Sequence, residues 1–388
     1  MNTSDPSTQF RTLNAKLPTG EVLPVLIKVE TGIPVQMGMY WISTERRFRT
    51  QWNTLNSDVQ ALKRLYEFST AIEQIDLDKF LIEGQTFNLF QIRSLAYYLR
   101  DGKQSNRYTQ RQLNTIANFL HWCLNPSNWT RICEVSAKQI QERQLQLKQD
   151  FNSCRRQQAS SERIEPLTAG EVAQILEIIG PVGVEEGRPI FSDNGVSPKV
   201  QLRNLVMFIL SLQLGLRRGE LLKLQVGDIC YRGKPEVRIV RRPSDPHDLR
   251  IPEPSVKTQE RSLVLSDLLL FYLNTYTDAD PPLGRVKGKT PYLFVTETGE
   301  PLSCSAADAI YRPISQKSGV KFSWHSLRHT CFEDLAGRAL NDGSGLEMLL
   351  PLGGWSQMKS VKHYAANAIE AHSNAWLQKY QNRSFSEG

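Results

Sequence analysis

The sequence lacks any apolar run long enough to cross a membrane. The longest run, Leu205 to Leu216, is interrupted by Ser211, Gln213 and Gly215, whereas a membrane-spanning helix needs about 20 apolar residues. The first ten residues, MNTSDPSTQF, are polar and contain no apolar signal core. We therefore expect no membrane partner and a protein that works in the cytosol.

Paired-cysteine patterns are also missing. The six cysteines stand at positions 123, 133, 154, 230, 304 and 331, and no two of them have the C-x-x-C spacing. Zinc sites and disulfide frameworks depend on such regular spacings. Reduced structural thiols are therefore the better interpretation.

The chain has no strong excess of one charge. Its 47 Lys and Arg residues stand against 40 Asp and Glu, which gives a net charge of +7. This balance is compatible with a nucleic-acid partner, but many basic proteins bind none. The hydrophobic content of 40% and charged content of 22% are typical of a globular protein. A length of 388 residues predicts two or three domains.

The N-terminal part changes character along its length. VLPVLIKV (22–29) and VQMGMYWI (35–42) predict two short strands, and the TGIP between them predicts a turn. Helical periodicity begins near Leu55 and returns after Asn106, while the segment 137–150 has helical propensity but is mostly polar. Residues 152–165 are polar and aperiodic, which indicates an exposed linker and a domain boundary at about 160.

The C-terminal part predicts helices around a small sheet. Thr168 and Glu171 have capping-box spacing, so a helix should begin there. A loop is expected over 181–199 and a nearly all-apolar helix over 200–214, whereas the segments 235–242 and 261–266 predict strands joined by a long loop. Further helices are expected at 266–276, 304–317, 325–337, 344–350 and 358–380. The predicted fold class is therefore mainly α with a small β-sheet (α+β).

Four short strings in this part contain residues suited to phosphate chemistry: LGLRRGEL (214–221), VKTQERSLVL (256–265), WHSLRH (324–329) and LGGWSQMKSVKHY (352–364). Arginine offers a permanently charged planar fork that matches a phosphate group. Arg217 follows Gly215, which can end the preceding helix, and Glu220 is placed to orient that arginine. His325 and Arg328 would share one face of a helix. Each string alone is weak evidence.

In this order, the strings resemble the active-site motifs of the tyrosine recombinases, the phage integrase family. LGLRRGEL resembles the first-arginine motif and HSLRHT the second. Lys257, followed by Arg261 and a strand, resembles the lysine of the family's β-hairpin. Trp355 and Tyr364 have the family's spacing between a His or Trp and the nucleophilic tyrosine. The resemblance covers 166–366 well and 48–160 loosely, and residues 1–47 match nothing in it.

The resemblance implies a role for each of these residues. Tyr364 would attack a DNA phosphodiester, while arginines and His325 hold the phosphate and Lys257 protonates the leaving 5′ oxygen. Lys234 competes with Lys257, but it lacks the following Thr-x-x-Arg context. Tyr311 and Tyr380 are the other tyrosines near enough to consider, and spacing favours Tyr364. The implied catalytic set is Arg217, Lys257, His325, Arg328, Trp355 and Tyr364, with Glu220 supporting Arg217.

The resemblance also implies an architecture and partners. We expect an N-terminal extension over 1–47, a helical core-binding domain over 48–160 and the catalytic domain over 161–388, which together would form a clamp around DNA. A homotetramer would recombine specific double-stranded sites, with accessory proteins possible, in the cytosol or nucleoid. The family uses neither metal nor nucleotide cofactor, which agrees with the lack of any carboxylate cluster suited to Mg²⁺. Phosphate contacts away from the site are expected from Arg107, Arg111, Arg143, Lys148, Arg155 and Arg156.

Other functions are compatible with parts of this pattern. The C-terminal helix, which includes Trp376 and Tyr380, would dock either on its own domain or on a neighbouring protomer. A telomere resolvase or another type IB strand-transfer enzyme would use a similar residue set. A regulator of the same fold that binds DNA without cutting is the alternative from another class. Integration or excision of a mobile element is the predicted role.

Overall fold

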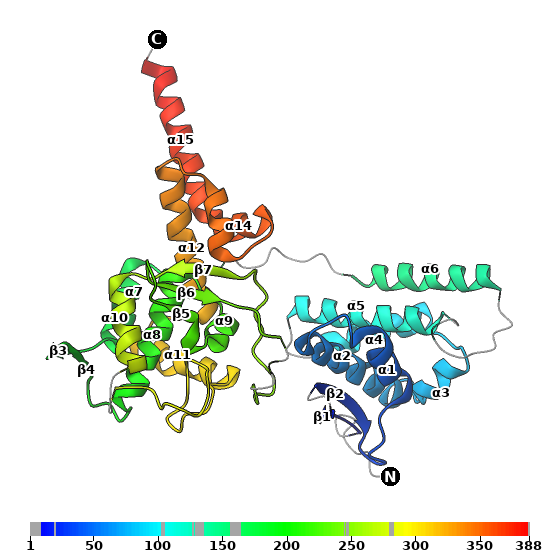
Figure 1. Ribbon diagram of the computed structural model, residues 1–388. Helices are drawn as coiled ribbons and strands as arrows, with labels where there is room; N and C mark the ends of the chain where they lie inside the picture. The colour runs from blue at the N-terminus through cyan, green and yellow to red at the C-terminus, as the bar shows by residue number, and fades with distance from the viewer. Residues whose placement is uncertain are drawn as a thin grey trace. The chain divides into compact units, whose positions relative to one another are not determined.

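The computed structural model describes residues 9–18, 21–101, 105–125, 128, 136–155, 164–243, 245, 248–278 and 283–386 (Figure 1). The chain divides into two compact units, Met1–Glu162 and Arg163–Gly388. Arg156 and Cys133, which the sequence analysis singled out, lie outside the described residues. No helix in the described ranges is both long and apolar enough to cross a membrane.

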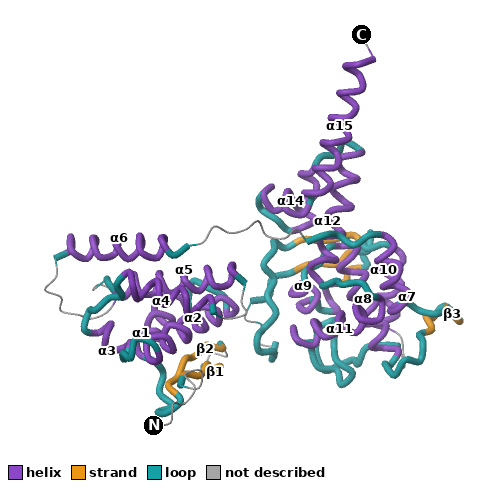
Figure 2. The backbone as a smooth tube through the Cα atoms, turned by 180° about the vertical axis from the view of Figure 1, so that it is seen from behind, coloured by secondary structure: helices purple, strands orange, loops and turns teal. Residues whose placement is uncertain are grey.

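The first unit packs a β-hairpin and a short helix onto a helical layer, as Figure 2 shows. Its antiparallel hairpin pairs Phe10 with Lys28 and Lys16 with Val22. One apolar core includes Leu26, Trp41, Leu62, Ile92 and Phe119 and so joins the hairpin to the helices. The elements are β1 Phe10–Lys16, β2 Val22–Lys28, α1 Gln36–Trp41, the π-helix Ile42–Arg46, α2 Trp52–Ala71, α3 Leu77–Ile82, α4 Leu89–Arg100, α5 Asn106–Cys123 and α6 Ala137–Ser153.

The predicted strand at 35–42 is wrong, because this segment forms helix α1. The Asp78 carboxylate accepts hydrogen bonds from the backbone N–H groups of Gln36 (3.0 Å) and Met37 (2.9 Å), and the Tyr66 hydroxyl accepts one from Gly38 (3.0 Å). These acceptors satisfy the free N–H groups of the first helical turn. Since both lie far along the chain, local propensity could not predict the helix.

The second unit is built around the buried helix α8, with a three-stranded antiparallel sheet in the order β5-β6-β7. This arrangement confirms the predicted fold class. The predicted loop at 181–199 contains the small hairpin β3–β4. The elements are α7 Ala169–Ile179, β3 Gly183–Glu185, β4 Arg188–Ile190, α8 Pro198–Leu214, α9 Arg218–Lys223, the 3-10 helix Val226–Asp228, β5 Ile229–Cys230, β6 Glu236–Ile239, β7 Arg261–Val264, α10 Asp267–Asp278, α11 Cys304–Ser318, α12 Trp324–Asn341, the 3-10 helix Leu346–Met348, α13 Leu349–Gly353, α14 Met358–Tyr364 and α15 Ala366–Ser386.

Ionic contacts attach the long β6–β7 loop to the body of the unit. The buried Lys223 ammonium lies 2.8 Å from the Asp248 carboxylate, and Arg250 Nε donates to Asp248 at 2.7 Å. Arg250 also donates to the carbonyls of Leu222 (3.0 Å) and Leu302 (2.8 Å). Burial alone would raise the pKa of Asp248, but its hydrogen bonds and charge interactions with Arg250 and Lys223 hold it at about 2. The loop is therefore a packed part of the unit.

The predicted C-terminal helix over 358–380 is two helices, α14 and α15, which meet just after Tyr364. The first turns of α15 pack beside α12, where the Glu333 carboxylate accepts a hydrogen bond from the backbone of Ala368 (Figure 1). From Glu370 to Asn382 every residue of α15 is exposed. Only the start of this helix therefore belongs to the core of its own unit.

Candidate active site

Arg217 stands at the corner between α8 and α9. Gly215 ends α8 with a φ of +61°, a left-handed conformation that favours glycine. A Cβ atom at this glycine would lie 2.4 Å from the Phe332 ring of α12, so the corner lies tightly against that helix. The Arg217 backbone N–H donates to Glu220 at 2.9 Å, and its guanidinium lies 3.8 Å from the same carboxylate. Glu220 thus contacts both the backbone and the side chain of Arg217.

The buried Glu220 carboxylate lies close to several arginine side chains. It receives hydrogen bonds from Arg261 Nη1 (3.1 Å) and Nη2 (3.0 Å) and from the Thr258 hydroxyl, and Arg328 lies 3.9 Å away. Burial would raise its pKa, but bonding to Arg261 and the charge of Arg328 hold the pKa of Glu220 below its usual value. It is therefore ionised at neutral pH.

Arg328 is completely buried on α12. It donates to the carbonyl oxygens of Gly215 and Gly353, the latter at 2.9 Å, which fixes its position between two glycine turns. Its guanidinium carbon lies 4.9 Å from the Trp355 ring centre and 5.2 Å from that of Tyr364. Burial, and then the charge of Arg217, lower the pKa of Arg328 to about 10, so the side chain remains charged at neutral pH.

Tyr364 ends α14 with its ring inside the site. The ring is 6% exposed, and its centre lies 5.0 Å from that of Trp355, 4.3 Å from that of His329 and 5.9 Å from that of His325. The adjacent His363 is exposed, and its ring centre lies 5.5 Å from that of Tyr364. The fold thus brings Tyr364 against residues of the strings 324–329 and 352–364.

The two histidines of α12 are held neutral. Burial, followed by the charges of Arg328 and Arg217, lowers the pKa of His325. Burial, together with His325 and His363, lowers the pKa of His329 to about 4. A neutral imidazole can accept a proton, so His325 is equipped to act as a base beside the tyrosine.

Three nitrogen donors of this site, Arg217 Nη1, Arg328 Nε and Trp355 Nε1, are buried and have no hydrogen-bond partner among the described residues. An unpaired buried donor costs about 1–3 kcal/mol. The site therefore has N–H groups available for an acceptor supplied from outside the chain.

Lys257 lies in the β6–β7 loop with an exposed side chain, and within the described part of the chain its ammonium makes no hydrogen bond or ion pair. The next residue, Thr258, bonds directly to Glu220. The structure thus places the backbone of Lys257 beside the site but does not bring its charge into contact with Arg217, Arg328 or Tyr364. Thr258 is not among the site residues predicted from the sequence.

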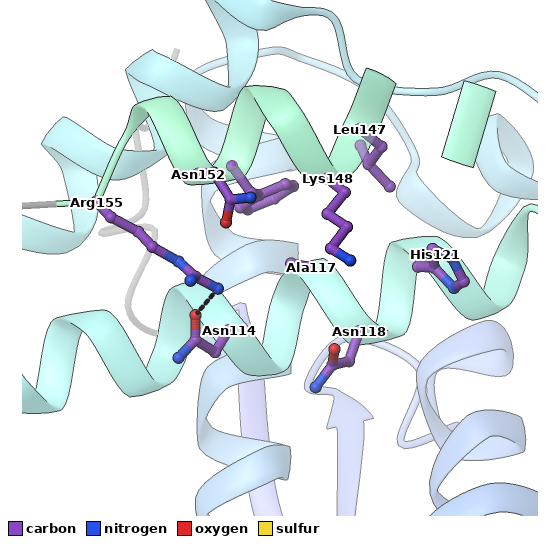
Figure 3. Close-up of a pocket in the computed structure, with 9 residues that line it drawn as sticks. Asn114, Ala117, Asn118, His121, Leu147, Lys148, Asn152 and Arg155 are labelled. Atoms are coloured by element: carbon purple, nitrogen blue, oxygen red, sulfur yellow. Dashed lines mark hydrogen bonds between the residues drawn. The ribbon is translucent and has the colours of Figure 1, made fainter. Parts of the chain in front are cut away.

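The predicted phosphate-binding residues lie on α5 and α6 and just beyond α6. Arg107, Arg111 and Arg143 are exposed. Lys148 and Arg155 line a groove of about 450 Å³ between the two helices, opposite Asn114 and Asn118 (Figure 3). Arg155 Nη2 donates to Asn114 at 3.2 Å. The two asparagines are not among the predicted residues, although they stand three and seven positions after Arg111, a spacing that indicates one exposed stripe of a helix.

Part of the sequence, and the fold, are similar to known proteins. Residues 191–370 match the Phage integrase family. The fold is similar to that of the transposon Tn1549 integrase in complex with transposon right-end DNA (15% identity, covering 89% of this chain and 99% of that one, TM-score 0.55). It is also similar to XerH recombinase bound to its difH substrate (14% identity, 89% and 86% covered, TM-score 0.53) and to a lambda integrase dimer bound to a core site (12% identity, 84% and 92% covered, TM-score 0.50). No curated protein matches the chain.

The match places residues 191–370 in the phage integrase family, the tyrosine recombinases. This region is thus that of a site-specific recombinase.

Proposed function

We propose that Tyr364 is the nucleophile of a reaction that cleaves and rejoins DNA strands through a 3′-phosphotyrosyl bond. The observation that carries this proposal is that Arg217, Arg328 and Trp355 each have a buried N–H donor without a hydrogen-bond partner among the described residues, and that Arg328 lies close to the rings of Trp355 and Tyr364. Phosphate oxygens are strong acceptors for such donors. A scissile phosphate at this site would meet donors that need an acceptor and a hydroxyl able to attack.

The proposed cleavage step assigns each proton and bond. The Tyr364 oxygen attacks phosphorus while its proton passes to the neutral imidazole of His325, and the bond from phosphorus to the 5′ oxygen breaks. Lys257 supplies the proton to that 5′ oxygen. Arg217 and Arg328 stabilise the charge that develops on the non-bridging oxygens, where preorganised donors contribute most to catalysis. Attack by a 5′ hydroxyl from another strand reverses these steps and rejoins the DNA.

We infer that the groove between α5 and α6 contacts the DNA target. The 18 residues of α5 include no Asp or Glu, and Arg107, Arg111, Asn114, Asn118 and His121 follow one another along its exposed side. Lys148 and Arg155 face this stripe across the groove. Lysine and arginine suit phosphate contacts, whereas asparagine can pair with an adenine edge. The solved relatives named above are complexes with DNA, which supports this assignment.

We further propose that four protomers assemble on two DNA sites and that the chain integrates or excises a mobile element. The family assignment and the resemblance to a transposon integrase support this role. Arg143, which does not line the groove, and Arg156 remain proposed phosphate contacts.

A nicked suicide substrate tests the proposed chemistry, because loss of the short strand traps the covalent intermediate. The unaltered chain should form a protein–DNA adduct and the Tyr364→Phe variant none, whereas Tyr311→Phe serves as a matched control that retains it. A chain that binds its site specifically but forms no adduct would instead be the non-cutting regulator.

A further inference from the structure

Arg261 lies at the start of β7, and all three nitrogens of its guanidinium donate hydrogen bonds to oxygen atoms of the same chain. Nε donates to the Leu352 carbonyl at 2.8 Å, Nη2 donates to Glu220 at 3.0 Å, and Nη1 donates to both Glu220 (3.1 Å) and the Thr258 hydroxyl (3.2 Å). Only 5% of its side chain is exposed. A guanidinium engaged in this way has little capacity left for a phosphate, so Arg261 differs from Arg217 and Arg328.

These bonds join three separate parts of the site. Glu220 belongs to the corner that supports Arg217, Leu352 belongs to the turn before Trp355, and Thr258 directly follows Lys257. The backbone N–H of Gln259 also donates to the Gly354 carbonyl at 3.0 Å. Residues 258 to 261 are therefore attached to the site at several points.

The fit at this junction is tight. A Cβ atom at Gly354 would lie 2.8 Å from the Thr258 Cβ, 2.9 Å from Arg261 Nη1 and 2.9 Å from the Gln259 carbonyl oxygen. Gly219 makes a similar contact on the other side of the loop, since its Cβ would lie 2.2 Å from the Ser255 carbonyl oxygen. The loop on both sides of Lys257 is thus held against α9 and against the turn before Trp355.

We propose that Arg261 is a positioning residue of the strand-cleavage reaction: it fixes the turn at 257–259, through Thr258 and Glu220, so that Lys257 can protonate the leaving 5′ oxygen. This inference rests on the proposed function. It explains why an exposed lysine in a long loop can deliver a proton to a defined atom. Arg261 itself touches neither the phosphate nor the tyrosine.

The experiment compares two leaving groups on a nicked duplex that carries the site at which the unaltered chain forms its adduct. One substrate has the normal 5′ oxygen at the scissile phosphate, and the other has a bridging 5′ sulfur. A thiolate leaves without being protonated, so the sulfur substrate does not need the general acid. Single-turnover rates at saturating protein separate this effect from DNA affinity.

Arg261→Ala should cleave the oxygen substrate about 10²-fold more slowly, a typical contribution of general acid catalysis. It should cleave the sulfur substrate nearly as fast as the unaltered chain, as Lys257→Ala should also do. Arg328→Ala, which removes phosphate stabilisation, should be slow on both substrates. Arg238→Ala, on the exposed face of β6, is the matched arginine control and should change neither rate.

Two results would overturn the inference: an Arg261→Ala variant as fast as the unaltered chain on the oxygen substrate, or one equally slow on both substrates. If this variant does not fold, Thr258→Val replaces it, since valine keeps the shape of threonine but cannot bond to Glu220. The same rates then decide the question. A chain that forms no adduct even when unaltered would remove the proposed function as well, and that result is distinct from these two.

Discussion

At the scale of single residues, the site depends on one buried carboxylate. Glu220 receives hydrogen bonds or charge from Arg217, Thr258, Arg261 and Arg328 within one small volume. Since Arg328 is fully buried and Arg261 nearly so, their charges need a buried counter-charge. Glu220 therefore supports both arginines that we assign to the phosphate and the arginine that we assign to positioning.

Glu220→Ala should lower the free energy of unfolding by about 3–5 kcal/mol, because it leaves buried arginines without their counter-charge. Urea unfolding of the complete chain measures this change. The matched control is Asp334→Ala, which breaks an exposed ion pair with Arg338 on α12 and should cost less than about 1 kcal/mol. Equal losses in the two variants would contradict the role given to Glu220.

The identities of the principal site residues could be predicted from sequence, because each stands in a short local string. Arg217, His325, Arg328 and Tyr364 are such residues, and the structure brings them close together. The roles of Thr258 and Arg261 could not be predicted in this way. Their partner Glu220 lies 38 and 41 positions away in the chain, and a hydrogen bond of that range leaves no local pattern.

At the scale of elements, glycine turns hold the site helices at close range. Gly354, with a φ of +62°, ends α13 just before Trp355, and its carbonyl accepts the hydrogen bond from Gln259. Because residues 258 to 261 approach its Cα so closely, a side chain at this position would push the Lys257 loop away. The turn therefore sets the distance between the loop and α13.

Gly354→Ala should destabilise the chain more than Gly343→Ala does. Both glycines have positive φ values, so each alanine costs about 1–2 kcal/mol for its backbone conformation. Only at Gly354 does the new methyl group meet neighbours, and this should add about 1–3 kcal/mol and slow adduct formation. Thermal unfolding of the two variants measures the difference, and equal melting temperatures would contradict the tight junction.

The α5–α6 groove makes a separate prediction about DNA affinity. Lys148→Ala, inside the groove, should weaken DNA binding and reduce the slope of log affinity against log salt by about 1, the value expected for one lost phosphate contact. Lys138→Ala, near the start of the same helix and outside the groove, is the control and should leave the slope unchanged. Identical slopes for both variants would argue against the groove as a DNA surface.

Element type is predicted well where the apolar periodicity is long, as in α2 and α5, and poorly where tertiary contacts decide. Segment 35–42 has the composition of a strand but forms α1, because Asp78 and Tyr66 satisfy its N–H groups. The break between α14 and α15 directly after Tyr364 was also missed. That break lets the tyrosine remain buried beside Trp355 and His329 while the following helix packs against α12.

At the scale of the whole molecule, the exposed half of α15 is the surface most suited to contact another protomer. Trp376 and Tyr380 stack with ring centres 6.0 Å apart, and they are 64% and 59% exposed. The start of the same helix packs on its own unit, which is one of the two placements considered for this helix. The contact with a second protomer is a proposal that follows from the proposed tetramer.

Trp376→Ala combined with Tyr380→Ala should leave binding of a single DNA site unchanged and reduce assembly of the higher-order complex. Alanine favours helix, so α15 should remain folded. Gln378→Ala with Lys379→Ala is the polar control on the same helix. Analytical ultracentrifugation on DNA measures the assembly, and full assembly by the aromatic variant would refute the proposed contact.

The central claim is that Tyr364 carries the DNA, and the mass of one peptide tests it most directly. The covalent adduct is trapped on a nicked substrate, trimmed with nuclease and digested with trypsin. Cleavage after Lys362 and Lys379 yields residues 363–379, whose only tyrosine is Tyr364, and it separates them from Tyr380. We predict that this peptide carries the nucleotide remnant. The remnant on the peptide beginning at Tyr380, or on any other peptide, would contradict the account.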